Sequence, residues 1–324
     1  MGCQPQNRTM HKFFSLFIGF VVLLAGLSFH TEPIGFVSKV NAQANNCENV
    51  KFGFGHYQKP QNTGRDITGQ SLDDIQDRGW ILIAVYTDFP PYSYEKDGKL
   101  VGVDIDLGRL IAKDLGVEAR FYATDAAENV DADLRNNIWK GRIVSGPVAN
   151  VMMHIPYNRE LVCRNEQVVL GGHYYNEKIA IAYAKEHYPD GGPTVPFFRF
   201  DKVGVENDTI SDFYLSGIRG GQIIPNMKRY KTTGEAMRGL AAGEVKAVMG
   251  PLGQLEHGLT EGLAVHSPPL VGLGLGEWTL SVATNFRWRP LGYSVEDTII
   301  AAVQDGRLEG IFKKHGLTYT PPKW

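Results

Sequence analysis

The sequence predicts an α/β protein of two lobes, each a sheet flanked by helices. Three observations support this prediction. Residues 80–122 follow the order strand, loop, helix, strand, and the same order returns between residues 203 and 249. The chain has 324 residues, of which 43% are hydrophobic, and this is enough for two packed cores.

The first strand is Ile81–Val85, a continuous apolar run that is typical of a strand buried on both faces. The loop that follows contains two adjacent prolines, which prevent regular hydrogen bonding and keep the chain extended. Ligands of open α/β sheets bind outside the carboxyl ends of strands. We therefore expect this loop, with Asp88, Phe89 and Tyr92, to lie at a ligand site.

An amphipathic helix should begin at Asp104 and end at Gly116, because apolar residues recur at helical spacing between them. Asp104 or Asp106 is expected to cap the free amide groups of this helix rather than bind a ligand. A strand over Val117–Tyr122 then completes a right-handed βαβ unit.

The remaining elements are expected in regular succession. In the first half a short helix covers 131–142 and strands cover 149–155 and 179–182, with 171–178 as a connection that leaves the first lobe. In the second half strands at 203–205, 228–232, 245–249 and 280–283 alternate with helices at 210–218, 234–242 and 296–309. Gly272, Gly274 and Gly276 lack the context of a nucleotide-binding loop, and we interpret them as a hinge.

The N-terminus, residues 1–44, is predicted to be a signal peptide. Arg8 and Lys12 precede an apolar run at 13–29, and Ala42-Gln43-Ala44 is a small-x-small cleavage site. The signal peptide would direct export to the periplasm and be cleaved after Ala44. An uncleaved anchor is the alternative, because about 17 apolar residues are at the short limit for a membrane span.

Charge and cysteine content exclude several classes of function. The chain has 33 Lys and Arg against 35 Asp and Glu, and this balance predicts no nucleic-acid partner. After removal of residues 1–44 only Cys47 and Cys163 remain. They either pair in an oxidising compartment or stay as separate thiols, and alone they cannot form a structural zinc site. The nine histidines lack metal-binding spacing, so we expect no metal and no cofactor.

Four segments, taken in order, carry a resemblance to a known family. They are FPPYSY…GKLVGVDIDLGRLIAKDLGV, KVGVENDTISDFYL, YKTTGEAMRGLAAGEVKAVMG and SVEDTIIAAVQDGRLEGIFKKHGL. Together they resemble the periplasmic solute-binding proteins of family 3, which serve polar amino-acid ABC importers. The resemblance implies the type II periplasmic binding protein fold, a small-molecule ligand captured between the lobes by hinge closure, and an ABC permease as the membrane partner.

The resemblance also implies where the lobes divide. Residues 45–78 would be an irregular N-terminal extension, residues 79–173 plus 278–324 would form lobe 1, and residues 178–270 would form lobe 2. The chain would cross between the lobes near Gly172–Lys178 and again near Val271–Trp278.

Departures from the family pattern bear on the ligand. Arg159 is the one candidate for the family's arginine that binds the ligand carboxylate through two parallel hydrogen bonds; a surface or interlobe salt bridge is the alternative. Gly250-Pro251 replaces the acidic residue that receives the ligand ammonium, and Glu206 stands where a basic or neutral residue is usual. A buried ammonium without a counter-charge is costly, so we expect a small polar or acidic ligand rather than a standard α-amino acid.

The candidate ligand contacts come from both lobes. They are Asp88, Phe89, Tyr92, Trp139, His154, Arg159, Glu206 and Thr209. For the aromatic residues and for His154 the alternative interpretation is packing in the core.

The segment 131–175 looks like a divergent subgroup that resembles the accessory proteins of PQQ-dependent, methanol-type alcohol dehydrogenases. This implies an alternative function, in which the protein is a partner of a periplasmic quinoprotein dehydrogenase or its cytochrome and has a degenerate ligand site. A minor alternative is a dehydratase of small cyclic acids with Asp88 or Glu206 as the acid–base group. The sequence lacks a G-x-S-x-G motif, and we do not expect an enzyme.

Overall fold

The computed structural model describes residues 70–142 and 146–323. The predicted signal peptide, the cleavage site after Ala44 and Cys47 lie outside the described residues. Cys163 is disulfide-bonded. No helix in the described part of the chain is both long and apolar enough to cross a membrane.

The first sheet has the strand order β4-β1-β5-β11-β6. Its members are β1 (Trp80–Tyr86), β4 (Glu118–Thr124), β5 (Val151–Tyr157), β6 (Val168–Ala184) and β11 (Glu277–Asn285). β1 runs parallel to β4 and β5, whereas β11 is antiparallel to β5 and β6. The last strand of the chain is therefore inserted between two strands of the first half.

Helices cover both faces of the first sheet. They are α1 (Leu72–Arg78), α2 (Val103–Asp114), α3 (Val130–Leu134), α4 (Arg159–Arg164), α8 (Arg289–Gln304) and α9 (Arg307–Lys314), with a π-helical turn at Arg135–Trp139. A small hairpin, β2 (Tyr94–Lys96) and β3 (Lys99–Val101), precedes α2. Ile83 of β1 packs in a core cluster with α2 and α8, and Ala84 packs in a second cluster with α3 and α4. Alternate residues of β1 thus enter opposite cores, as the apolar run predicted.

The second sheet has the order β6-β9-β7-β8, with β10 on the other edge of β6. The new strands are β7 (Val203–Glu206), β8 (Met227–Tyr230), β9 (Ala247–Pro251) and β10 (Leu263–His266), and the helices are α5 (Ile210–Gly217), α6 (Thr233–Ala241) and α7 (Leu252–His257). Short 3-10 turns lie at Val195–Arg199, Ile218–Gly220, Ile224–Asn226 and, in the first lobe, Phe286–Trp288. Separate apolar clusters form on the two faces of this sheet. The predicted architecture of two sheets, each flanked by helices, is confirmed.

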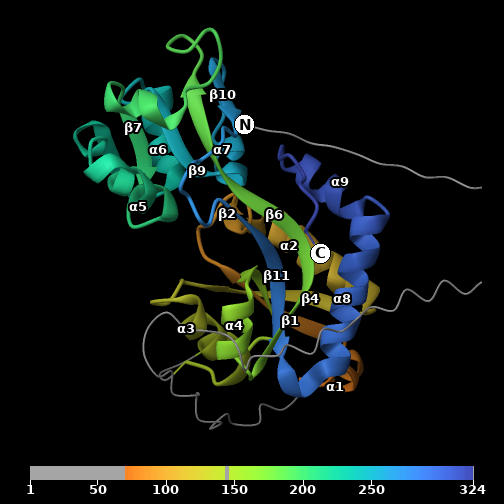
Figure 1. Ribbon diagram of the computed structural model, residues 1–324. Coiled ribbons are helices and arrows are strands. Elements are labelled where there is room, and N and C mark those ends of the chain that lie inside the picture. Colours follow the sequence, from red (N-terminus) through yellow and green to blue (C-terminus); the bar gives the residue numbers. More distant parts are fainter. Residues whose placement is uncertain (1–69, 143–145, 324) are drawn as a thin grey trace, which may run out of the picture. The chain divides into compact units, whose positions relative to one another are not determined.

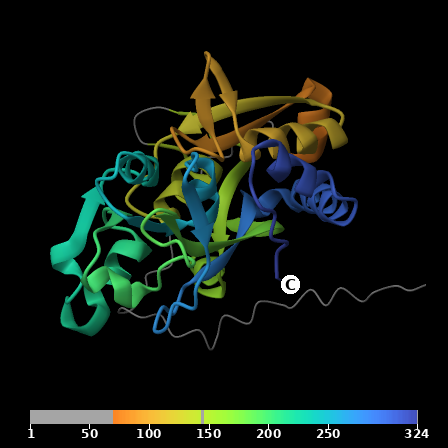
Figure 2. The same ribbon diagram turned by 90° about the horizontal axis from the view of Figure 1, so that it is seen from above.

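One strand belongs to both sheets. β6 is 17 residues long; residues 168–178 pair with β11, and residues 179–183 pair with β9. Figures 1 and 2 show β6 running from the part of the molecule that holds β1 and β4 into the part that holds β7 and α5. The sequence predicted a connection at 171–178, but the crossing is itself a strand. Gly172 has φ 55° where the register with β11 shifts. This glycine therefore marks a bulge in a continuous strand and not the end of the strand.

Two other boundaries differ from the prediction. The stretch predicted as irregular ends in helix α1, whose start is capped by the Ser71 hydroxyl accepting from the Asp74 amide. The single helix expected over 296–309 is two helices, α8 and α9, because Gly306 at φ 82° separates them.

Candidate functional site

The loop after β1 is closed on itself by backbone pairing. Phe89 and Ser93 exchange hydrogen bonds of 2.8 and 2.9 Å, and the Ser93 hydroxyl donates to the Tyr86 carbonyl at 2.7 Å. Asp88, at φ 45°, is left exposed, whereas Tyr92 is 1% exposed. The loop therefore directs these two candidate residues into different environments.

The backbone of the same loop caps helix α2. The amides of Val103 and Asp104 donate to the carbonyls of Pro91 and Tyr92 at 3.1 and 2.9 Å. Gly102 makes this approach possible: its φ is 132°, and a Cβ there would lie 2.1 Å from the Tyr92 carbonyl oxygen. No side chain caps α2. The prediction of an aspartate cap is therefore wrong, and the Asp104 side chain has other partners.

A buried carboxylate joins the two lobes beside the crossing strand. The Tyr92 hydroxyl donates to Glu177 in β6, and Glu177 also accepts from the amide of Gly253 in the first turn of α7. A Cβ at Gly253 would lie 2.3 Å from the Tyr92 hydroxyl oxygen, so only glycine admits this contact. Burial raises the pKa of Glu177 above its usual value of 4.5, and the hydrogen bond from Tyr92 offsets part of that rise.

A second buried carboxylate lies next to the first. Asp104 is 0% exposed; it accepts a hydrogen bond of 2.9 Å from the Tyr174 hydroxyl and lies 3.1 Å from Nδ1 of His154. His154 has φ 64°, a backbone conformation that is uncommon for a residue other than glycine. Strained backbone of this kind is found at sites where the surrounding structure fixes the residue.

Three predicted candidates meet at this place. The His154 ring centroid lies 4.2 Å from that of Tyr92 and 4.9 Å from that of Phe89, and the Phe89 and Tyr92 rings stack at 5.5 Å. With Asp104 and Glu177 these residues form what we call the crossing cluster. In this structure Tyr92 is a contact between the lobes and is not an exposed ligand wall.

Helix α7 provides further contacts between the lobes. His257 at its end lies edge-on to Tyr94 of the β2–β3 hairpin, with ring centroids 5.5 Å apart. Glu256 accepts from the amide of Thr318 at 2.8 Å. The second lobe therefore rests on the first through α7, next to the crossing cluster.

The candidates from the second lobe lie together at the carboxyl end of β7. The Glu206 carboxylate accepts from the amide and the hydroxyl of Thr233 at 2.9 and 2.7 Å, so it occupies the N-terminus of α6. Thr209 caps α5 and donates its hydroxyl to the Glu206 carbonyl at 2.8 Å. A negative charge at a helix N-terminus is favourable, and here the chain supplies it.

The last two candidates are apart from these groups. Trp139 is 7% exposed and packs in the core cluster beside α3 and α4, and its indole nitrogen has no hydrogen-bond partner among the described residues. Arg159 is exposed at the start of α4. Among the described contacts, none joins Trp139, Arg159 or Asp88 to the crossing cluster or to Glu206.

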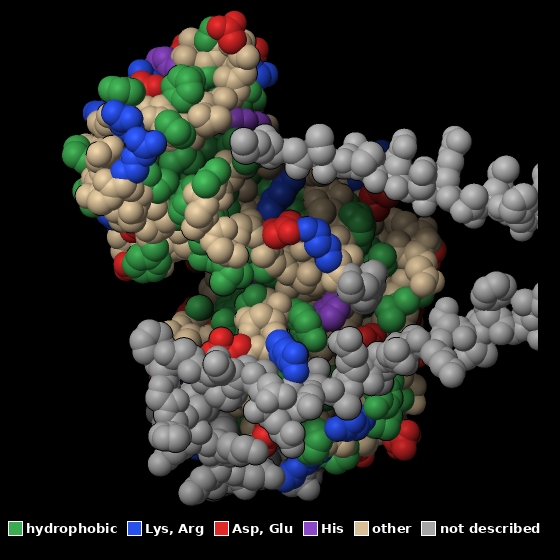
Figure 3. All heavy atoms as spheres, in the orientation of Figure 1, with side chains coloured by type: hydrophobic (Ala, Val, Ile, Leu, Met, Phe, Trp, Pro, Cys, Tyr) green, Lys and Arg blue, Asp and Glu red, His purple; other side chains and the backbone are tan. Residues whose placement is uncertain are grey.

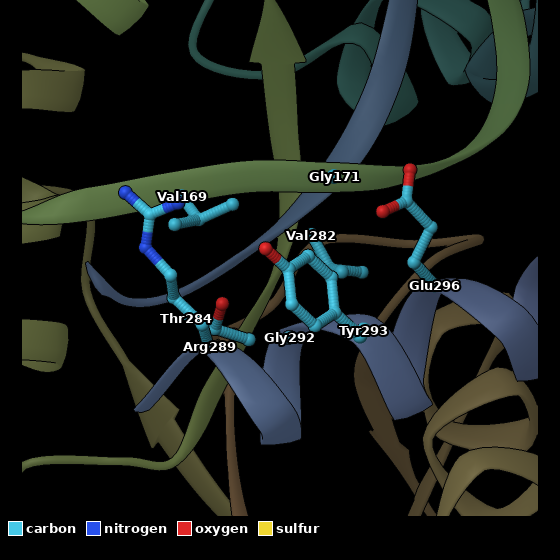
Figure 4. Close-up of a pocket in the computed structure, with 8 residues that line it drawn as sticks. All are labelled: Val169, Gly171, Val282, Thr284, Arg289, Gly292, Tyr293 and Glu296. Atoms are coloured by element: carbon cyan, nitrogen blue, oxygen red, sulfur yellow. The ribbon is translucent and has the colours of Figure 1, made fainter. Parts of the chain in front are cut away.

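A small cavity beneath the crossing strands is too small for a solute. Its volume is about 40 Å³, and Figure 4 shows Tyr293 and Glu296 of α8 facing β6 and β11 across it. About 10–15 Å³ of this kind of volume is enough for one water molecule, so the cavity has room for a few water molecules. Within the described residues no group of three or more acidic, histidine or cysteine side chains is arranged to hold a metal ion.

Sequence reasoning missed the partners that organise the site. The sequence places Tyr174 and Glu177 in the predicted connection 171–178 and predicts Asp104 only as a helix cap. A signal was present for Glu177, because a carboxylate in the crossing segment lies two residues before the apolar run Ile179–Ala182. Its partner Tyr92 is 85 residues away in sequence, and a local pattern does not reveal that pairing.

Known proteins are similar to this chain in the sequence of part of its first lobe and in its fold. Residues 81–138 match the model of bacterial extracellular solute-binding proteins, family 3. The L-cystine-binding protein TcyJ of Escherichia coli K12 is 37% identical over 54 residues, which are 16% of this chain and 20% of that protein. The chain thus matches about a fifth of the length of this curated relative.

Solved structures match over most of the chain. An ancestral cationic amino acid solute-binding protein, AncCDT-1, aligns with a TM-score of 0.62 at 20% identity, covering 76% of this chain and 99% of that one. The chain has the fold of a two-lobed solute-binding protein. An arginine-bound amino acid ABC transporter substrate-binding protein from Streptococcus pneumoniae aligns with a TM-score of 0.56 at 22% identity, covering 77% and 99%. The predicted resemblance to solute-binding proteins of family 3 is therefore confirmed.

Proposed function

We propose that this chain is an exported solute-binding protein that captures a small polar or acidic ligand between its lobes and delivers it to an ABC importer. One observation carries the proposal: a single strand, β6, belongs to the sheets of both lobes. A two-lobed body connected in this way can open and close, and a ligand that contacts both lobes shifts it toward the closed state.

The second crossing supports the same mechanism. Trp278 at the start of β11 packs against the core of the first lobe and against one core of the second. The glycine-rich segment 272–276 directly precedes it. We propose that this segment is the second hinge, and that the lobe boundaries lie at 173–178 and 271–278 as the sequence predicted.

The ligand chemistry is proposed from the charges at the strand ends. Glu206 already fills the N-terminus of α6, so a ligand carboxylate is not bound there. Arg159 remains the candidate for a ligand carboxylate, and Glu206 with Thr209 would receive polar or cationic groups. Asp88 and Phe89 are proposed to contact the ligand from the loop after β1.

A melting-temperature screen tests this function. The protein is heated with a library of small acids, amino acids and polyols, each alone. One chemical class should raise the melting temperature by an amount that grows with concentration, because a ligand that binds only the folded state stabilises it. An unchanged melting temperature across the library would refute solute capture.

The partner protein of a periplasmic quinoprotein dehydrogenase is the second candidate. It is favoured by the missing ammonium acceptor at Gly250-Pro251, since a scaffold with a degenerate ligand site does not need that group. Genes for a permease and an ATPase beside this gene would support import. Genes for a dehydrogenase and a c-type cytochrome there would support the partner role.

A dehydratase on this fold is the weakest candidate. One solved neighbour is described as a precursor of cyclohexadienyl dehydratase, but at 20% identity this likeness concerns the fold. Acid–base catalysis would need a substrate-accessible carboxylate with a raised pKa. Glu177 has the raised pKa, but at 1% exposure it is closed to a substrate in this structure.

A further inference from the structure

The second lobe carries a groove that is lined by none of the residues proposed to bind solute. It lies between the 3-10 turn Val195–Arg199, the end of α5 and residues 269–271, and its volume is about 350 Å³. The Tyr214 hydroxyl donates to the Val271 carbonyl at 2.9 Å and so fixes two of its walls together. We call it the lobe-two groove.

The surroundings of the groove are strongly apolar for an exposed surface. Val271 is 86% exposed, Phe200 78%, Phe213 64% and Phe197 51%. Most of the groove lining is apolar: Val195, Pro196, Ile218, Ile223, Pro269 and Val271. In the sequence, Phe197 and Phe200 lie within two residues of the groove residue Arg199, and Phe213 precedes the groove residue Tyr214. Exposed apolar surface of this kind marks sites that bind other proteins. A small solute would leave most of these side chains in water.

The charge of the groove has a single sign. Arg199 and Arg219 line it, and no carboxylate does. Both arginines are exposed, and neither makes an ion pair with another described residue within 4.0 Å. Figure 3 shows Lys and Arg side chains next to hydrophobic ones on the lobe that carries α5. A complementary surface would therefore be acidic.

Arg219 is held in an unfavourable backbone conformation. Its φ and ψ are 45° and 42°, the left-handed region that side chains other than glycine and asparagine rarely adopt. The next two residues, Gly220 and Gly221, are glycines with positive φ. Glycine would suit position 219 equally well, so folding does not explain an arginine at the edge of an apolar groove.

We infer that the lobe-two groove docks a segment of a partner protein that presents an apolar side chain flanked by carboxylates. The apolar side chain enters between Tyr214 and Val271, and the carboxylates pair with Arg199 and Arg219. The segment 267–276 that forms one wall leads directly into β11 and the second crossing. The docked partner therefore lies against the proposed hinge. This inference does not depend on which solute the protein binds.

Binding of a synthetic peptide tests the inference. The probe is a fluorescein-labelled peptide with Leu-Phe between pairs of aspartates, and its counterpart has lysines in place of the aspartates. Fluorescence anisotropy with the protein made from the full chain should show saturable binding of the acidic peptide and at least about tenfold weaker binding of the lysine peptide. Added salt should weaken the acidic peptide's binding.

Variants place that binding in the groove. Arg219→Gly suits the local backbone, so its melting temperature should equal or exceed that of the parent while peptide affinity falls several-fold. Arg289→Ala is the control, because it removes an arginine that does not line the groove and whose guanidinium lies 5.2 Å from the Phe286 ring in the first lobe. Arg289→Ala should leave peptide affinity unchanged.

Several results would overturn the inference. They are absence of saturable binding, equal binding of the two peptides, and equal loss of affinity in Arg219→Gly and Arg289→Ala. Sedimentation could also show that the protein self-associates. If Val271→Asp abolished that self-association, the groove would bind a second copy of this chain instead. None of these results requires a solute, so a failure here is distinct from a failure of the proposed function.

Discussion

The hydroxyl of Tyr92, in the loop after the first strand, donates a hydrogen bond to the carboxylate of Glu177, in the strand that crosses between the lobes. Both side chains are 1% exposed. The amide of Gly253 from α7 binds the same carboxylate, so groups from both lobes converge on one buried charge. The relative position of the lobes is therefore coupled to the hydrogen bonding of Glu177.

Tyr92→Phe should destabilise the protein, because it removes a side-chain donor from a buried carboxylate. We expect a loss of about 1–3 kcal/mol in the free energy of unfolding, measured by urea denaturation. Tyr175→Phe is the matched control. The Tyr175 hydroxyl is also buried but has no hydrogen-bond partner in the part of the chain that the structure describes, so its removal should be neutral or slightly stabilising. Equal losses in the two variants would show that the Tyr92 contact contributes no specific stability.

Gly253→Ala should disturb the same contact by steric overlap. The new Cβ would lie 2.3 Å from the Tyr92 hydroxyl oxygen but 3.2 Å from the adjacent ring carbon, and overpacking of this kind typically costs about 1–3 kcal/mol. In a Tyr92→Phe background the cost should fall markedly, because the closest atom is gone. Gly274→Ala, where a Cβ meets nothing within 4 Å, is the control. Additive effects of the two substitutions would contradict the structure at this point.

Glu177 should make stability depend on pH in a defined direction. Burial raises the pKa of Glu177 above 4.5, so the folded state binds its proton more tightly than the unfolded state. The contribution of Glu177 to the free energy of unfolding is therefore fully present below pH 4.5 and is lost as the pH rises through the folded-state pKa. Relative to Glu177→Gln, the parent should therefore lose stability as the pH rises above 4.5. A constant difference between the two proteins from pH 4 to pH 8 would rule this out.

His257 should act in the opposite direction at the interface formed by α7. Burial, with smaller contributions from His315 and Lys96, lowers the pKa of His257 below 6.5. The stability that the neutral ring contributes is present above pH 6.5 and is lost as the pH falls through the lowered pKa. His257→Gln should reduce the loss of stability between pH 7 and pH 5, measured by denaturant titration at each pH. If the variant loses as much stability between pH 7 and pH 5 as the parent, groups other than His257 cause that loss.

Glu206 should matter for solute binding more than for folding. Glu206→Gln retains an acceptor for Thr233 but removes the charge at the start of α6, so the solute-induced rise in melting temperature should shrink while the unliganded value changes little. Glu244→Gln, on the surface of the same lobe and paired with Lys228, is the control. A full solute response in Glu206→Gln would remove Glu206 from the proposed site.

The sequence was sufficient for the fold because the fold depends on local patterns. The run Ile81–Val85 is apolar at every position, and both of its faces are buried. The helical spacing from Ile105 to Leu115 likewise identified α2. In the second half the predicted strands and helices are present, but α7 and β10 lie between two of them and were not predicted. The predicted element boundaries were wrong where a glycine can either end an element or only bend it. Gly172 bends a continuous strand, whereas Gly306 divides a predicted helix into two.

The site was less predictable because its residues act through distant partners. Phe89, Tyr92 and His154 were identified as candidates, and they do lie together. Asp104 was expected to cap a helix, but its carboxylate meets Tyr174, which is 70 residues away in sequence. Such pairings depend on how β5, β6 and α2 pack, and no local pattern encodes that arrangement.

Small-angle X-ray scattering, with and without the solute that most raises the melting temperature, tests the central claim most directly. The account predicts that saturating solute reduces the radius of gyration, because closure brings the two lobes together around the ligand. The reduction should be lost at solute concentrations far below the dissociation constant. An identical scattering profile with saturating solute would contradict capture of a ligand by closure of the lobes.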